Sequence, residues 1–176
     1  MPKKKDNTMV TFHRTFSLKR KPIADILIYA NNNPETNLSQ KKLVEEIKFG
    51  TIYGVAFPRY AIFAGLLNES RKGVTDVGKI IIEKDSVLAS RDTQWMIHYH
   101  LSSSKRFGPP FWPYLVTKFF IIDNIFERDD VQRMLTDFHW ELSETVLLDA
   151  SQTSTVGAFL NTYINDDGLG SLSLIE

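Results

Sequence analysis

The histidine with the clearest potential for chemistry is His13, in the segment Phe12-His13-Arg14-Thr15-Phe16. A histidine next to an arginine could orient a phosphate group, or could transfer a proton as a general acid or base. His13 is therefore the candidate catalytic residue. The structural alternative is a histidine that caps a neighbouring helix.

Two other groups of residues could bind a metal. His98 and His100 are two positions apart, so on a helix they point in different directions and cannot share an ion. We expect one to be buried and hydrogen-bonded and the other exposed. Four carboxylates could hold Mg²⁺ for phosphodiester cleavage, although an acidic first turn of a helix is the simpler interpretation: Asp123, Glu127, Asp129 and Asp130.

No metal site is therefore predicted, and Mg²⁺ is expected only if the protein nicks DNA. The chain has no cysteine, which excludes disulfides and Cys-ligated zinc or iron–sulfur centres. It also has no Walker motif or dinucleotide-binding fingerprint, so no other cofactor is evident.

The cations are concentrated in the front of the chain. Residues 1–60 carry eleven Lys and Arg against five Asp and Glu, whereas residues 123–176 carry two against eleven. A basic front can attract a polyanion although the whole chain is neutral. The alternative is an ordinary solvated surface. The candidate DNA contacts in the front segment are Arg14, Lys19, Arg20 and Lys21.

A second basic cluster, Lys105 and Arg106, lies among aromatic residues around Gly108-Pro109-Pro110. Cations interleaved with aromatic rings can hold phosphate and stack an unpaired base, so both residues are candidate DNA contacts. Alternatively, the aromatic residues only begin the next core helix.

The elements that would position these residues include a helix-turn-helix pattern. Ser39 is a good N-cap, Gly50 ends the first helix, and Pro58 is expected to open the second. Arg59 and Tyr60 then lie near the N-terminus of the second helix, where recognition helices contact DNA. The alternative is a winged helix that binds only protein.

The remaining patterns predict a mainly α-helical fold, a winged helix-turn-helix with additional C-terminal helices. Residues 10–16 alternate like a short strand, 74–82 suit either a short helix or a wing strand, and Asp92 is expected to cap a helix from Thr93. Helices are also predicted at 22–29, 111–122, from Asp129 and at 155–163. The expected domains are a flexible basic arm (1–9), a winged-helix-like domain (10–104) and a helical extension (105–176) that could continue in a longer protein.

The N-terminal residues lack the apolar core of a signal peptide, and no apolar run approaches the roughly 18 residues that span a bilayer. We therefore expect a cytoplasmic protein without a membrane partner.

Four stretches, in order, resemble the DUF4007 family: Phe12–Phe16, Tyr53–Leu67, Thr75–Leu101 and Val156–Tyr163. The first is similar to the family's Phe-His-Glu-Thr-Phe, with Arg14 in the position of Glu. The third ends in Trp95-Met-Ile-His-Tyr99, similar to a Trp-Leu-Leu-His-Trp motif. Ala56-Phe57-Pro58 departs from the family's Gly-Lys-Asn, which weakens the case for base reading by the following helix.

The resemblance implies a DNA-binding component of a prokaryotic DNA-modification (phosphorothioation) or phage-defence system. Its partners would be double-stranded DNA and other proteins of the same operon. Two alternatives are open: a metal-dependent nicking endonuclease of that system, and a winged-helix scaffold for protein interactions.

Overall fold

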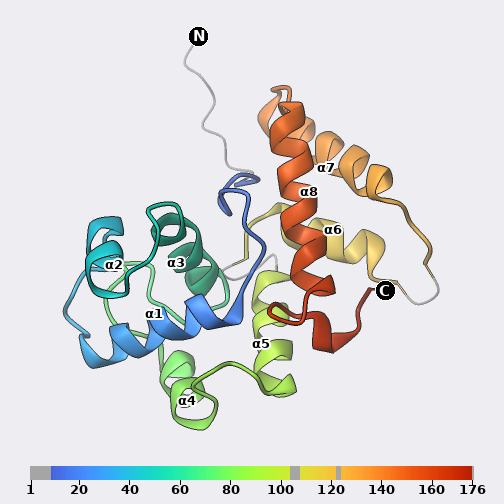
Figure 1. Cartoon of the computed structure of the whole chain (residues 1–176). Coiled ribbons are helices and arrows are strands. Elements are labelled where there is room, and N and C mark those ends of the chain that lie inside the picture. The colour runs from blue at the N-terminus through green and yellow to red at the C-terminus, as the bar shows by residue number, and fades with distance from the viewer. Residues whose placement is uncertain (1–8, 104–107, 122–123, 176) are drawn as a thin grey trace.

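The described residues of the computed structural model, 9–103, 108–121 and 124–175, form a mainly helical protein (Figure 1). The prediction of a mainly α fold is confirmed. The helices are α1 (Arg20–Asn32), α2 (Gln40–Glu46), α3 (Tyr53–Phe63), α4 (Asp76–Lys84), α5 (Arg91–Leu101), α6 (Phe111–Phe119), α7 (Arg128–Ser143), α8 (Asp149–Ile164) and the short 3₁₀ helix η1 (Gly170–Leu172).

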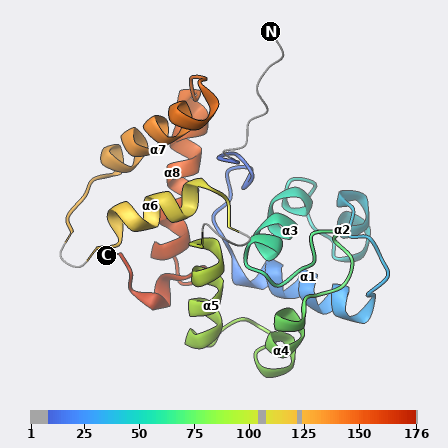
Figure 2. The ribbon, with the colours of Figure 1, turned by 180° about the vertical axis from the view of Figure 1, so that it is seen from behind.

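Helices α1 to α4 gather on one side of the molecule and α5 to α8 on the other, as both ribbon views show (Figures 1 and 2). Pro22 lies in the first turn of α1, where its missing N–H costs nothing. Ser39 caps α2 by accepting a hydrogen bond from the Lys42 N–H at 3.2 Å. Leu38 and Leu43, on either side of this cap, are both fully buried.

Helix α3 begins earlier than the sequence indicates. It starts at Tyr53, so Pro58 lies inside the helix instead of opening it. The proline lacks the N–H that would bond the Gly54 carbonyl. Burial of Phe57 and Ala61 on either side of Pro58 offsets this loss. The prediction that Pro58 starts the helix is therefore wrong.

The region expected to form a wing contains a helix. Residues 74–82 were compatible with a helix or a strand, and α4 covers most of them, capped by the Thr75 hydroxyl. Among the described residues no strand is present, and a single antiparallel bridge joins Leu67 to Val74. The described residues therefore show a loop between Leu67 and Val74 and no strand of the predicted wing.

The other side of the molecule is built from α5 to α8. Helix α5 is capped by Ser90, whose Oγ accepts from the Thr93 N–H, so Asp92 lies in the first turn and is not the cap as predicted. Helix α7 begins one residue before Asp129, and Asp130 accepts a hydrogen bond from the Glu127 N–H at 2.9 Å. Helices α6 and α8 both pack against α7.

The segment before α1 joins the two sides. Residues 10–16 form consecutive turns and not the predicted strand, with Arg14 and Thr15 at positive φ. The Leu18 N–H donates to the Thr162 hydroxyl on α8 at 3.0 Å, and the Tyr60 hydroxyl on α3 donates to the Phe16 carbonyl at 2.8 Å. This buried segment therefore fixes α3 and α8 relative to each other.

In the described part of the chain, none of the helices combines the length and apolar character needed to cross a membrane.

Candidate nucleic-acid interface

One face of α3 lines two neighbouring hollows on the surface. Val55, Arg59, Ile62 and Phe63 follow helical spacing and are all half-buried. Arg59, Ile62 and Phe63 line a groove of about 420 Å³, and Val55 lines a pocket of about 730 Å³. Thr11 lines both hollows, so they adjoin at the N-terminal turn.

Three arginines from separate segments meet at these hollows, and together they form the arginine cluster: Arg14, Arg59 and Arg71. Arg59 comes from α3, Arg14 from the N-terminal turn and Arg71 from the loop between α3 and α4. Burial lowers the pKa of Arg59, and the positive charges of Arg14 and Arg71 lower it further. Arg59 is therefore repelled by both of the other charges in the folded protein.

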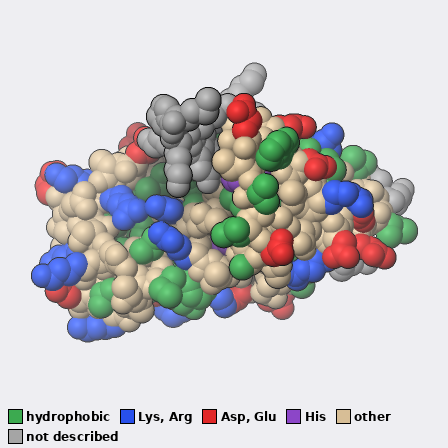
Figure 3. Space-filling model, turned by 90° about the horizontal axis from the view of Figure 1, so that it is seen from above, with side chains coloured by type: hydrophobic (Ala, Val, Ile, Leu, Met, Phe, Trp, Pro, Cys, Tyr) green, Lys and Arg blue, Asp and Glu red, His purple; other side chains and the backbone are tan. Residues whose placement is uncertain are grey.

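Neutralising carboxylates are scarce at this cluster. Glu69 lines the groove with Arg59 and Arg71, but within the described residues no ion pair joins it to either arginine. Figure 3 shows Lys and Arg side chains together on the α1–α3 side of this face. Like charges held close without a counter-charge favour binding of an anion.

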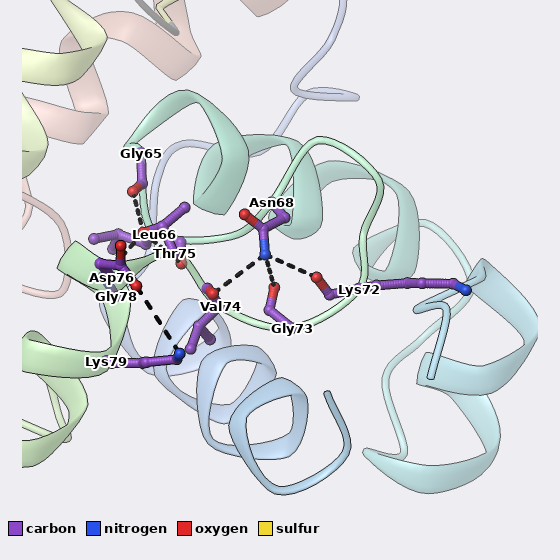
Figure 4. A network of polar contacts seen from close by, with 10 residues as sticks. All are labelled: Gly65, Leu66, Asn68, Lys72, Gly73, Val74, Thr75, Asp76, Gly78 and Lys79. Atoms are coloured by element: carbon purple, nitrogen blue, oxygen red, sulfur yellow. Dashed lines mark hydrogen bonds and ion pairs between the residues drawn. The ribbon is translucent and has the colours of Figure 1, made fainter. Parts of the chain in front are cut away.

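The loop 67–74, which carries Arg71, is held by hydrogen bonds from the Asn68 side chain, and Figure 4 shows these bonds. The Asn68 side-chain amide donates to the carbonyls of Lys72, Gly73 and Val74 at 2.9 to 3.2 Å. Arg71 itself has a φ of 59° and donates its N–H to the Asn68 carbonyl. A non-glycine residue in this region costs energy, so the surrounding bonds hold the arginine in place.

The same loop is attached to the start of α4. The Thr75 hydroxyl donates to the Gly65 carbonyl at 2.7 Å and accepts from the Gly78 N–H at 3.0 Å. One side chain thus caps α4 and anchors the end of α3. Both ends of the loop that carries Arg71 are therefore rigid.

His13 supports Arg14 through the backbone. The Thr15 N–H donates to Nδ1 of His13 at 3.0 Å, which leaves the proton on Nε2, 3.1 Å from the Thr155 hydroxyl. Burial lowers the pKa of His13 to about 4, so the ring is neutral at pH 7. His13 is a positioning residue for the Arg14–Thr15 turn, and both of its nitrogens are occupied, which argues against the catalytic role considered for it.

Tyr60 and Arg20, both expected to contact DNA, make contacts within the fold. Tyr60 is fully buried. The Arg20 guanidinium donates to the carbonyls of Leu88 at 3.1 Å and Asp166 at 2.5 Å, which ties α1 to the end of the chain. Because Tyr60 is buried, the prediction that it contacts DNA is wrong, whereas the prediction for Arg20, whose side chain is partly exposed, stays a prediction.

The neighbouring lysines are matched by carboxylates. Lys19 pairs with Asp167 at 2.5 Å, which raises the pKa of Lys19, and Lys21 pairs with Asp25 at 3.0 Å. Both pairs are partly exposed and can exchange with solvent. Both lysines therefore have a carboxylate partner, Asp167 after α8 for Lys19 and Asp25 on α1 for Lys21, and DNA contacts by them stay predictions.

Several predicted features lie outside the described residues: most of the basic arm, together with Lys105 and Arg106. The division into domains at residue 104 stays a prediction. Helix α5, expected in the first domain, contacts η1 in the C-terminal half.

The described residues contain no group of three or more His, Asp or Glu side chains placed to hold a metal ion. Asp130 pairs with Arg133 at 2.6 Å, and Asp123 lies outside the described residues.

His98 is bonded to the Tyr163 hydroxyl at 2.9 Å, and burial lowers its pKa to about 4. His100, two residues on, is also buried, so neither is the exposed histidine that was expected.

Arg71 is the site residue that the sequence did not reveal. It lies in Asn68-Glu-Ser-Arg-Lys-Gly73, which has the composition of a polar turn. The signal that could have identified Arg71 is a cation in a tight turn directly after the second predicted helix, where a wing would lie. The adjoining pocket depends on residues more than a hundred positions apart, such as Thr11 and Ser154, and has no local signature.

Comparisons with protein families, characterised proteins and solved structures find no match to this chain.

Proposed function

We propose that this protein binds nucleic acid, duplex DNA in the first place, through the backbone phosphates at the arginine cluster. The observation that carries the proposal is the convergence of Arg14, Arg59 and Arg71 on one face. Arginine suits phosphate because its planar guanidinium donates paired hydrogen bonds and stays charged at every physiological pH.

The geometry favours phosphate contacts over base reading. Arg59 is half-buried in a groove whose other lining residues include Thr11 and Phe12 of the N-terminal turn and Arg71 of the loop. A helix recessed in this way presents little surface for insertion into a major groove. Contacts to phosphate bring affinity without sequence preference.

The interpretation as a helix-turn-helix gains support from α2 and α3, which follow each other and pack together. The bridge between Leu67 and Val74 would be a reduced wing. Membership of DUF4007 and a place in a modification or defence system stay predictions from the resemblance alone, as does DNA nicking.

Fluorescence anisotropy with a labelled duplex of about 20 base pairs at low salt tests the proposal. We expect binding by the full chain, and at least about tenfold weaker binding by the double variant Arg59→Gln, Arg71→Gln. Arg133→Gln is the control for the loss of one arginine charge elsewhere, on α7 where Arg133 pairs with Asp130, and it is compared with the single variants Arg59→Gln and Arg71→Gln as well as with the double variant. Absence of binding by the full chain, or equal losses in control and double variant, would contradict the proposal.

A further inference from the structure

The pocket beside the arginine cluster has the dimensions of a small-molecule site. Its volume is about 730 Å³, within the range of roughly 300–1,000 Å³ found for ligand pockets. Its walls come from four separate segments: the N-terminal turn, the start of α2, the start of α3 and the first turns of α8.

The residues that line this pocket suit an anion with an apolar part. Four hydroxyl groups, an amide, a guanidinium and two aliphatic side chains are present, and no lining residue is acidic: Thr11, Thr15, Ser151, Ser154, Gln40, Arg14, Ile52 and Val55, together with His13 and Ala150. Hydroxyl, amide and guanidinium groups can donate hydrogen bonds to phosphate oxygens. The Ser154 hydroxyl already donates to the Ser151 carbonyl, and Gln40 uses one of its two amide protons on the Thr51 carbonyl, so the donors for a phosphate come mainly from Arg14 and the other hydroxyl groups.

Arg14 supplies the positive charge in the lining of the pocket. It lines the pocket, and its charge also acts on Arg59, so this member of the arginine cluster belongs to the pocket as well. Its φ of 51° and the φ of 78° at Thr15 are unusual for non-glycine residues, above all for a β-branched threonine. The buried His13 bond to the Thr15 N–H holds this turn in place.

The apolar part of the pocket lies on α3 and just before it. Ile52 is more than half exposed and Val55 is half-buried, so both offer aliphatic surface to a ligand. A phosphate at Arg14 with a flat ring packed against these two aliphatic side chains describes a nucleotide, since the face of a base can make van der Waals contacts with such surfaces.

We propose that this pocket binds a single 5′-phosphorylated nucleotide, either free or at the end of a nucleic-acid strand. The second source rests on the proposed function, because the strand would then continue across the arginine cluster. The first source is independent of it.

Isothermal titration calorimetry of the full chain with AMP, adenosine and inorganic phosphate tests the proposal. We expect AMP to bind at least about tenfold more tightly than either fragment, because phosphate and ring contacts act together. Ala150→Phe places a ring at an exposed position on the pocket wall. It should weaken AMP binding about tenfold, whereas Arg133→Gln, on α7 and outside the pocket, should change it less than about twofold.

Ser154→Phe fills the same pocket from the next turn of α8 and guards against a folding defect in the first variant. Oligonucleotides with a 5′-phosphate or a 5′-hydroxyl distinguish the two sources. Tighter binding of the phosphorylated strand, abolished by Ala150→Phe, supports the strand end; AMP binding without this difference supports the free nucleotide. If neither AMP nor the 5′-phosphate is preferred, or if both filling variants bind AMP normally, the proposal is wrong.

Discussion

Arg59 combines a cost to stability with a proposed role in binding. Its charge is partly buried and lies close to two other positive charges, and both effects disfavour the charged form in the folded protein. A residue that opposes folding in this way fits a binding site, where stability is commonly given up for function.

We therefore expect Arg59→Gln to stabilise the free protein by about 0.5 kcal/mol at low salt while it weakens DNA binding. Urea unfolding followed by circular dichroism measures the first effect. Arg133→Gln should have the opposite sign, because Arg133 forms an ion pair with Asp130 at 2.6 Å. Loss of stability in Arg59→Gln would mean that this guanidinium has a structural role.

His13 makes the stability depend on pH. Its pKa is about 4 in the folded protein and 6.5 in the unfolded chain, so the unfolded chain binds the proton more readily. Above about pH 6.5, His13 is neutral in both states and the free energy of unfolding is not reduced by its protonation. As the pH falls from about 6.5 to about 4, protonation of His13 in the unfolded chain lowers the free energy of unfolding by up to about 3 kcal/mol. Histidine ring signals in an NMR titration report this pKa directly, and a His13 pKa near 6.5 would contradict the buried, neutral ring.

At the scale of elements, the loop 67–74 depends on the close approach of α4 to the end of α3. A Cβ at Gly78 would collide with the Leu66 carbonyl oxygen, which is part of the backbone and cannot swing away. The same carbonyl accepts the Thr75 N–H at 3.0 Å. Gly78 is thus required for the packing that holds both ends of the loop.

Gly78→Ala should destabilise the protein by about 2 kcal/mol or more and weaken DNA binding, since it displaces the loop that carries Arg71. Gly50→Ala is the control, because nothing lies within 4 Å of a Cβ at that position; its effect should stay within about 0.5 kcal/mol. Thermal unfolding and anisotropy measure the two effects, and equal stabilities for the two variants would contradict this packing.

The local parts of this fold could be predicted from the sequence. Ser39 and Pro22 have effects that extend only a few residues. The structure confirms Ser39 as the cap of α2 and Pro22 in the first turn of α1, although α1 begins two residues before Pro22, at Arg20. The prediction that Pro58 starts α3 was wrong because favourable burial of its neighbours outweighs the usual preference of proline for the first turn of a helix. The roles of Tyr60 and Arg20 depend on contacts distant in sequence, with Phe16 and with Asp166, which no local pattern contains.

At the scale of the whole molecule, the N-terminal segment joins two groups of helices. It is bonded to α8 through Leu18 and Thr162, and to α3 through Phe16 and Tyr60. Both sides of the molecule contribute to one continuous set of buried apolar residues. The pocket beside the arginine cluster also depends on the N-terminal segment, because the pocket forms only when α3 and α8 keep their positions.

We expect a single cooperative unfolding transition for both sides. Circular dichroism reports all helices, whereas tryptophan fluorescence reports α5, α6 and α7 through Trp95, Trp112 and Trp140. The two curves should coincide, and Thr162→Val should shift both by about 1–3 kcal/mol because it leaves the Leu18 N–H without its acceptor. Separate transitions, or a shift in only one curve, would show that the sides fold independently.

The central claim is that three arginines on one face bind nucleic-acid phosphates, and the salt dependence of binding tests it most directly. The duplex affinity is measured by anisotropy between about 50 and 200 mM salt, for the full chain and for the variant with Arg14, Arg59 and Arg71 all changed to Gln. The account predicts that the slope of log affinity against log salt falls by about 2 to 3 in the variant. An unchanged slope, with binding retained, would contradict it.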